Sequence, residues 1–169
     1  MLKGFILLYL LVIFSNFDFA GQYYIDILGG NNSNTGESET SAWKDFSPVN
    51  SRTFSGGDKI FLIRGGVWNQ QLIINGSGDP GNFIEVSAYG TGSRPHIRRN
   101  GDIADRCMRL NNSSYVKVSS LAVSNGGAGI VVYYDHDYNN TAVYFDNIVA
   151  HDFFGIYRAS GEYGCDPSW

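Results

Sequence analysis

The chain has 169 residues, of which 43% are hydrophobic and 17% are charged. A charged fraction this low, against about 25% in typical domains, excludes a highly charged disordered chain, and the 21 glycines indicate many tight turns. The net charge of −4 leaves no basic surface for a phosphate backbone, so nucleic acid is not an expected partner.

The N-terminus has the pattern of a secretory signal peptide. Lys3 supplies a short cationic segment, and the apolar run from Phe5 to Phe14 is shorter than the ~17–25 residues needed to cross a bilayer. A buried hydrophobic helix is the alternative, and the turn-rich sequence that follows disfavours it. We therefore predict a signal peptide over residues 1–20, an extracellular or periplasmic location, and no membrane segment after cleavage at Ala20.

The rest of the chain is predicted to be all-β. Residues 21–56 are expected to form a strand, a loop and a cap, with one helical turn over 42–46, and residues 57–169 the first coils of a solenoid. Short runs rich in β-branched and aromatic residues predict strands at Tyr23–Ile27, Ile60–Ile63, Leu72–Ile74, Phe83–Val86, His96–Arg98 and Cys107–Leu110. Their spacing alone fits an antiparallel sandwich as well as a solenoid.

An internal repeat favours the solenoid. Apolar residues recur with a period of about 27 residues, within the range of 20–50 that is typical of stacked coils. The aligned pairs are Val116 with Val143, Val118 with Phe145, Leu121 with Ile148, Val123 with Ala150, and Gly129-Ile130 with Gly155-Ile156. We therefore predict a parallel β-helix, in which equivalent side chains of successive coils form columns at a spacing of about 4.8 Å.

Several segments also resemble a known superfamily. The segments are Tyr23-Tyr24-Ile25-Asp26, Ala42-Trp43-Lys44, residues 56–68 and residues 81–92. They are similar to the N-terminal region of secreted right-handed parallel β-helix proteins of the pectate-lyase-like superfamily, over most of residues 22–158. The resemblance implies an extracellular polysaccharide as substrate and a polysaccharide lyase or a glycoside hydrolase as activity. It transfers no catalytic residue, because the matched segments belong to the first coils.

A polar loop suggests a metal site. Asp135, Asp137 and Asn139 place oxygen ligands at alternate positions, as the first half of a calcium-binding loop does. Asn140 stands where an EF-hand has glycine, so the alternative is a solvated acidic turn. Calcium is therefore the one cofactor that the sequence suggests, and no motif for a nucleotide cofactor is present.

The candidate catalytic residues are Asp146, His151, Asp152 and Arg158. In a lyase, Arg158 and a bound calcium would neutralise a uronate carboxylate while His151 removes a proton. A hydrolase needs two carboxyl groups about 5–5.5 Å or ~6.5–9.5 Å apart. In the repeat alignment Asp152 lies over Asn125, which disfavours a hydrolytic pair within these two coils. The alternative for His151 is a structural histidine in a turn.

Four tyrosines are candidates for stacking on sugar rings, namely Tyr133, Tyr134, Tyr138 and Tyr157. They keep open a second function, a non-catalytic carbohydrate-binding or adhesin-like module. Cys107 and Cys165 would be able to pair in an oxidising compartment, or Cys107 is simply packed in a strand. The chain ends without a segment able to cover the last coil, so we expect an incomplete, inactive fragment that self-associates through an open C-terminal coil.

Overall fold

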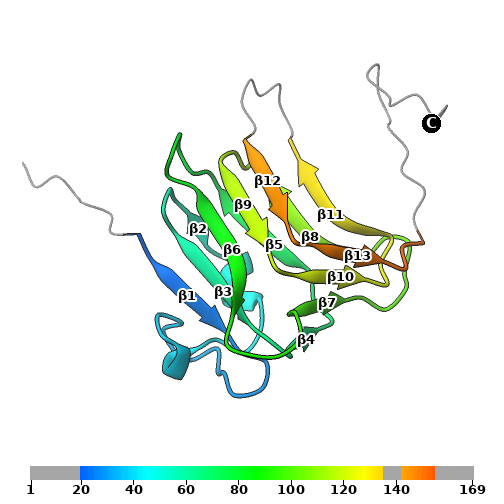
Figure 1. Cartoon of the computed structure of the whole chain (residues 1–169), viewed down its shortest axis with the longest axis horizontal. Helices are drawn as coiled ribbons and strands as arrows, with labels where there is room; N and C mark the ends of the chain where they lie inside the picture. The colour runs from blue at the N-terminus through cyan, green and yellow to red at the C-terminus, as the bar shows by residue number, and fades with distance from the viewer. Residues whose placement is uncertain (1–19, 135–141, 155–169) are drawn as a thin grey trace, which may run out of the picture.

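The computed structural model describes residues 20–134 and 142–154, and these form three parallel β-sheets (Figure 1). Sheet 1 contains β1 (Gln22–Ile25), β3 (Lys59–Ile63), β6 (Ile84–Tyr89), β9 (Val116–Ser119) and β12 (Val143–Asp146). Sheet 2 contains β4 (Val67–Trp68), β7 (His96–Arg98), β10 (Ala122–Ser124) and β13 (Val149–His151). Sheet 3 contains β2 (Thr53–Phe54), β5 (Leu72–Gly76), β8 (Arg106–Asn111) and β11 (Ala128–Tyr133).

The chain visits the sheets in a fixed order, so each coil adds one strand to each sheet. β3, β4 and β5 form one coil, β6, β7 and β8 the next, and β9, β10 and β11 the one after. Every pair of neighbouring strands is parallel, which short hairpin turns cannot produce. The fold is therefore a parallel β-helix, as the sequence predicts, and an antiparallel sandwich is excluded.

The register of the strands confirms the internal repeat. Val143 lies opposite Val116 in the pairing of β12 with β9, and Ala150 lies opposite Val123 in the pairing of β13 with β10. The corner after β10 stacks on the corner after β13, because the backbone N–H of Asn125 donates to the Asp152 carbonyl oxygen at 3.0 Å. The predicted stacking of Asp152 on Asn125 is thus confirmed.

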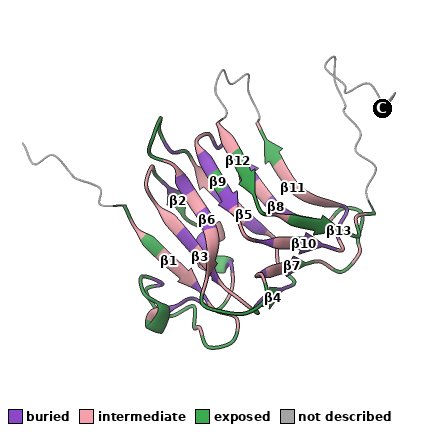
Figure 2. Cartoon of the chain, viewed as in Figure 1, coloured by how far each residue is buried: buried purple, intermediate pink, exposed green. Residues whose placement is uncertain are grey.

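The core consists of inward-facing columns. Alternate residues are buried in strands of the inner coils, as in β3, where Ile60 and Leu62 face inward and Lys59, Phe61 and Ile63 do not. The register places inward residues of successive strands opposite one another, as with Ile60, Val86 and Val118, so each column continues from one coil to the next. Burying one such aliphatic side chain is worth about 1.5–3 kcal/mol, so the columns supply most of the stability. Figure 2 shows that the buried residues concentrate in the inner coils, whereas β12 and β13 are largely exposed.

The expected helical turn over 42–46 is wrong. The short helices lie on either side of it, at η1 (Glu39–Ser41) and α1 (Ser47–Asn50), where Pro48 occupies the first turn of α1. Trp43 instead continues sheet 1 through a parallel bridge to Ile25 and is 4% exposed. The Asn32 side chain accepts the backbone N–H groups that follow Trp43, which stabilises an extended chain rather than a helix there.

Several predicted features lie outside the described residues. They are the signal peptide apart from Ala20, the calcium ligands Asp135, Asp137 and Asn139, and the residues Tyr138, Tyr157, Arg158 and Cys165. These remain predictions. Cys107 is a free, buried thiol whose hydrogen bond goes to the Ser124 carbonyl oxygen. Among the helices of the described part, none is long and apolar enough to span a membrane.

Candidate functional site

A groove of about 450 Å³ lies along the outer face of sheet 1. The outward side chains of four successive strands, β3, β6, β9 and β12, form its floor. Its lining residues are Lys59, Phe61, Glu85, Ser87, Lys117, Val118, Ser119, Tyr144 and Asp146. The groove therefore runs across the coils, which is the arrangement that stacked columns produce on the outside of a parallel β-helix.

Across this groove, Lys59, Glu85 and Lys117 form one column of charged groups, and Ser87 and Ser119 lie in the neighbouring column. The Lys59 ammonium lies 3.3 Å from the Glu85 carboxylate, and both side chains are well exposed, so the pair contributes little to stability. Lys117 lies opposite Glu85 in the register of β9 with β6. The Ser119 hydroxyl donates to the Ser87 hydroxyl at 2.9 Å. These side chains offer both donors and acceptors to a polar ligand.

Aromatic rings border the same groove. Tyr144 is 56% exposed, and its ring centroid lies 5.6 Å from that of Phe83. The Lys117 ammonium lies over the Phe83 ring at 4.3 Å, which fixes the direction of the lysine stem. Phe61 lines the groove at its other end, on β3. Rings beside hydrogen-bonding groups suit a ligand that has apolar faces and polar edges.

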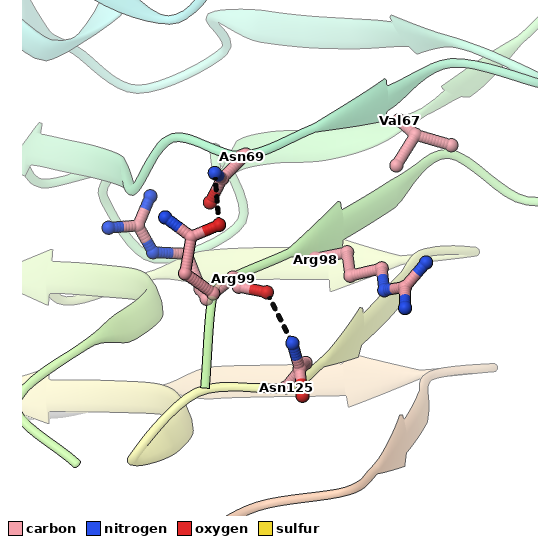
Figure 3. Close-up of a pocket in the computed structure, with 6 residues that line it drawn as sticks. Val67, Asn69, Arg98, Arg99 and Asn125 are labelled. Atoms are coloured by element: carbon pink, nitrogen blue, oxygen red, sulfur yellow. Dashed lines mark hydrogen bonds between the residues drawn. The ribbon is translucent and has the colours of Figure 1, made fainter. Parts of the chain in front are cut away.

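A second, smaller pocket of about 340 Å³ lies where sheet 2 turns toward sheet 3. It is lined by Val67, Asn69, Arg98, Arg99, Asn100 and Asn125. In Figure 3, Asn69 and Asn125 lie on one side of the pocket, and Val67 and Arg98 lie on the other. The side-chain amide of Asn125 donates to the Arg99 carbonyl oxygen at 2.6 Å. This hydrogen bond between successive coils holds the corner of the pocket in place.

Next to this pocket, two histidines meet on the outer face of sheet 2. The rings of His96 and His151 are 5.9 Å apart, and His96 Nε2 is 2.8 Å from the Ser124 hydroxyl. His151 Nδ1 is 2.7 Å from the Asp152 carboxylate. Burial, followed by the positive charges of His151 and Arg98, lowers the pKa of His96 from its ordinary value of 6.5.

The predicted catalytic residues divide between the two sheets. Asp146 lines the groove of sheet 1, on β12. His151 and Asp152 lie together at the end of β13, on sheet 2, and neither lines that groove. The structure therefore brings His151 to Asp152 but does not place Asp146 in the same site.

The predicted stacking tyrosines that are described lie on a third surface. Tyr133 ends β11 on sheet 3, where the Arg109 guanidinium lies 4.3 Å from its ring centroid. The Tyr134 hydroxyl donates to the Ser113 carbonyl oxygen at 2.7 Å. Neither tyrosine lines the groove of sheet 1. Their role in sugar binding stays a prediction.

Sequence reasoning missed most residues of both surfaces. Glu85 and Lys117 in the groove, and His96 and Ser124 on sheet 2, were assigned no function. The available signal was their position, since each lies on the outward side of a strand whose other face is apolar. Within the described residues, no group of three or more His, Cys, Asp or Glu side chains is placed to hold a metal ion.

Comparison with known proteins identifies structural relatives only. No model of a known protein family matches the sequence, and no curated protein sequence matches it. The chain is similar to the crystal structure of a selenomethionine derivative of a GH136 lacto-N-biosidase from Eubacterium ramulus, with a TM-score of 0.73 and 25% identity. The match covers 80% of this chain and 27% of that chain.

The native crystal structure of the same Eubacterium ramulus lacto-N-biosidase agrees with this match. Its TM-score is 0.65 and its identity is 24%, with coverage of 80% of this chain and 28% of that chain. The likeness thus extends over most of the described coils. The chain spans about a quarter of the length of the enzyme that it resembles.

Proposed function

We propose that the chain contributes substrate-binding coils to a carbohydrate-processing enzyme of the glycoside hydrolase type. The observation that carries the proposal is the structural likeness to the GH136 lacto-N-biosidase, at a TM-score of 0.73 over 80% of the chain. A hydrolase is favoured over a lyase because that relative is a glycosidase. Since the chain spans only 27% of the relative, the activity of the whole enzyme is part of the proposal.

The groove of sheet 1 is the proposed glycan-binding surface. It crosses four strands, so three inter-strand steps of about 4.8 Å give it the length of a short oligosaccharide. Tyr144 and Phe61 offer rings to the apolar faces of sugars. Lys117 and Asp146 offer a donor and an acceptor to sugar hydroxyl groups. The groove therefore supplies the two kinds of contact that saccharide binding requires.

The groove supports binding more directly than cleavage. Its two carboxylates, Glu85 and Asp146, lie on β6 and β12, which are separated by β9. Two inter-strand steps amount to about 9.6 Å. Glu85 lies opposite Lys117 and Lys117 lies opposite Tyr144, so Asp146 is also displaced by two residues, about 6.6 Å, along the strand. The two backbone positions are thus roughly 12 Å apart, beyond both the ~5–5.5 Å of a retaining pair and the ~6.5–9.5 Å of an inverting pair. The Lys59 ammonium also holds Glu85 toward β3, away from Asp146. This separation favours the second candidate function, a carbohydrate-binding module without catalysis.

The proposal is tested with the full chain and a panel of oligosaccharides that includes one ending in lacto-N-biose. Binding is measured by calorimetry, and cleavage by the release of reducing sugar. We expect binding that Tyr144→Ala weakens at least tenfold, because the exposed ring is lost from the groove. Phe154→Ala is the matched control, since that ring is 55% exposed and lies outside the groove.

Each outcome separates the two functions. Release of reducing sugar together with the Tyr144→Ala effect supports the hydrolase. Binding with the same effect but without cleavage supports the carbohydrate-binding module. Failure to bind any oligosaccharide, or equal losses in Tyr144→Ala and Phe154→Ala, contradicts both.

A further inference from the structure

The outer face of sheet 2 has a cationic character that is unusual in a chain of net charge −4. No strand of this sheet contains an aspartate or a glutamate. Arg98, Ser124 and His151 share one outward row, because Arg98 lies opposite Ser124 in one pairing and Ser124 lies opposite His151 in the next. His96 reaches the same row through its contact with Ser124. Three potential cations thus surround one hydroxyl group.

The surroundings leave Arg98 without a counter-ion. The Arg98 side chain makes no hydrogen bond or ion pair with the residues that the structure describes. By contrast, the neighbouring Arg99 is paired with Asp105 at 2.7 Å. The carboxylate that follows His151, that of Asp152, is likewise bound, to His151 Nδ1 at 2.7 Å. An exposed guanidinium with five donors is therefore available to a planar anion.

The outward residues of the adjoining strands add no negative charge. The outward residue of β4 is Val67, and Asn69 follows that strand. The other outward residues are Ala122 and Ser124 in β10, and Val149 and His151 in β13. Arg94, which precedes β7, donates to the Asn147 side chain. The field at His96 is consequently set by positive groups.

We propose that the outer face of sheet 2 binds the anionic group of a saccharide, a carboxylate or a sulfate ester, with Arg98 as the main ligand and His96 and His151 beside it. The adjoining asparagine-lined pocket receives the rest of the sugar. The inference deepens the proposed function and rests on it for the saccharide part. The anion contact itself follows from the side chains of sheet 2.

The crowding of positive groups supports this assignment. His151 and Arg98 both act to lower the pKa of His96, after burial, so protonation of that imidazole is unfavourable while the face is empty of anions. A bound carboxylate or sulfate group would reverse that repulsion. The bound anion is therefore expected to raise the pKa of His96.

The pocket beside Arg98 fits the polar remainder of a sugar. Asn69 and Asn125 lie on the opposite side of the pocket from Arg98, so a ligand between them touches the guanidinium at one end and amide groups at the other (Figure 3). Amide side chains both donate to and accept from hydroxyl groups. This arrangement distinguishes a charged saccharide from a small free anion, which needs only Arg98.

The test uses the full chain with three probes: a heparin oligosaccharide, an oligogalacturonate and neutral maltohexaose. We expect one or both of the charged probes to bind, more weakly as salt rises, and maltohexaose not to bind this face. Arg98→Gln should weaken binding of the charged probes at least tenfold. Arg64→Gln is the control, because Arg64 is also unpaired among the described residues and lies in the turn after β3, outside sheet 2.

A titration of His96 by NMR gives a second readout. The bound charged probe should raise the pKa of His96 in the parent chain but not in Arg98→Gln. Binding of the heparin probe alone identifies a sulfate ester, and binding of the oligogalacturonate alone identifies a carboxylate; either supports the proposal. Equal losses in Arg98→Gln and Arg64→Gln, or no binding of either charged probe, overturn it. Binding of neutral oligosaccharides in the sheet 1 groove under those conditions would leave the proposed function intact.

Discussion

At the scale of single residues, the position of a side chain on its strand decides its role. In the three-residue strand β7, Ile97 is fully buried, while His96 and Arg98 face outward on the same strand. The sequence predicts the strand itself, and the alternation of side chains along any strand accounts for these faces. Which neighbours an outward residue meets depends on the path of the next coil, so the contact of His96 with Ser124 was not predictable.

His96 gives the structure a specific pH dependence. Its pKa is lowered in the folded protein, so below the ordinary value of 6.5 the unfolded chain binds a proton that the folded protein does not. The stabilising effect is fully present above pH 6.5 and is lost as the pH falls through the lowered pKa. We expect the free energy of unfolding to fall between pH 7.5 and pH 5, and to fall less in His96→Gln, which retains a polar group near Ser124.

The measurement is urea unfolding at several pH values for both proteins. A matched control is Arg64→Gln, which removes a charge without touching the histidine. An identical pH dependence in His96→Gln and the parent chain would contradict the shifted pKa.

At the scale of elements, the corners between strands are defined by residues with left-handed backbone. Asn125, after β10, has φ of 59°, and Asp152, after β13, has φ of 57°. Asparagine and aspartate tolerate this conformation better than most residues with a side chain. The sequence repeat therefore includes the corner as well as the strands, and the alignment of Asn125 with Asp152 was predictable from it.

Asn125 combines conformation with a hydrogen bond, and the two effects are separable. Asn125→Gly keeps the left-handed turn and loses only the bond to the Arg99 carbonyl oxygen, at a cost of about 1 kcal/mol. Asn125→Ala loses the bond and also places a Cβ in the left-handed region, which adds roughly 1–2 kcal/mol. Urea unfolding of the three proteins measures the difference, and equal stability of the Ala and Gly variants would show that the backbone conformation is not strained.

The N-terminal segment was less predictable than the corners. The aromatic pair Trp43 and Phe46, three residues apart, suggested a helical face, yet Trp43 stacks on Tyr23 with ring centroids 5.4 Å apart and planes at 6°. That contact joins residues far apart in sequence, and the bonds from Asn32 hold the backbone extended. The spacing of two aromatic residues does not predict contacts with residues far away in the sequence.

At the scale of the whole molecule, the coil repeat explains why the fold was predictable and the site was not. Stacking depends on inward apolar residues, which recur visibly along the chain. The groove draws outward residues from four strands, and Tyr144 belongs to it while Tyr133 lies on sheet 3. The sequence alone does not distinguish the two tyrosines, because the sheet to which each strand belongs is determined by the path of the chain around the coil.

The last described coil leaves apolar surface exposed. Phe145 continues the inward column of Val118 but is 45% exposed, and Tyr144 and Val149 on the same edge strands are exposed as well. Exposed edge strands favour association with other chains. Self-association through this coil stays a prediction of the sequence.

The central claim is that the chain is a parallel β-helix that binds a glycan on the outer face of sheet 1. It is tested most directly by a crystal structure of the full chain with the neutral oligosaccharide that binds most tightly in calorimetry. We predict parallel coils in the observed register and a sugar across β3, β6, β9 and β12, in contact with Tyr144 and Asp146. A neutral sugar seated on sheet 2 or sheet 3, or strands that pair antiparallel, would contradict the account.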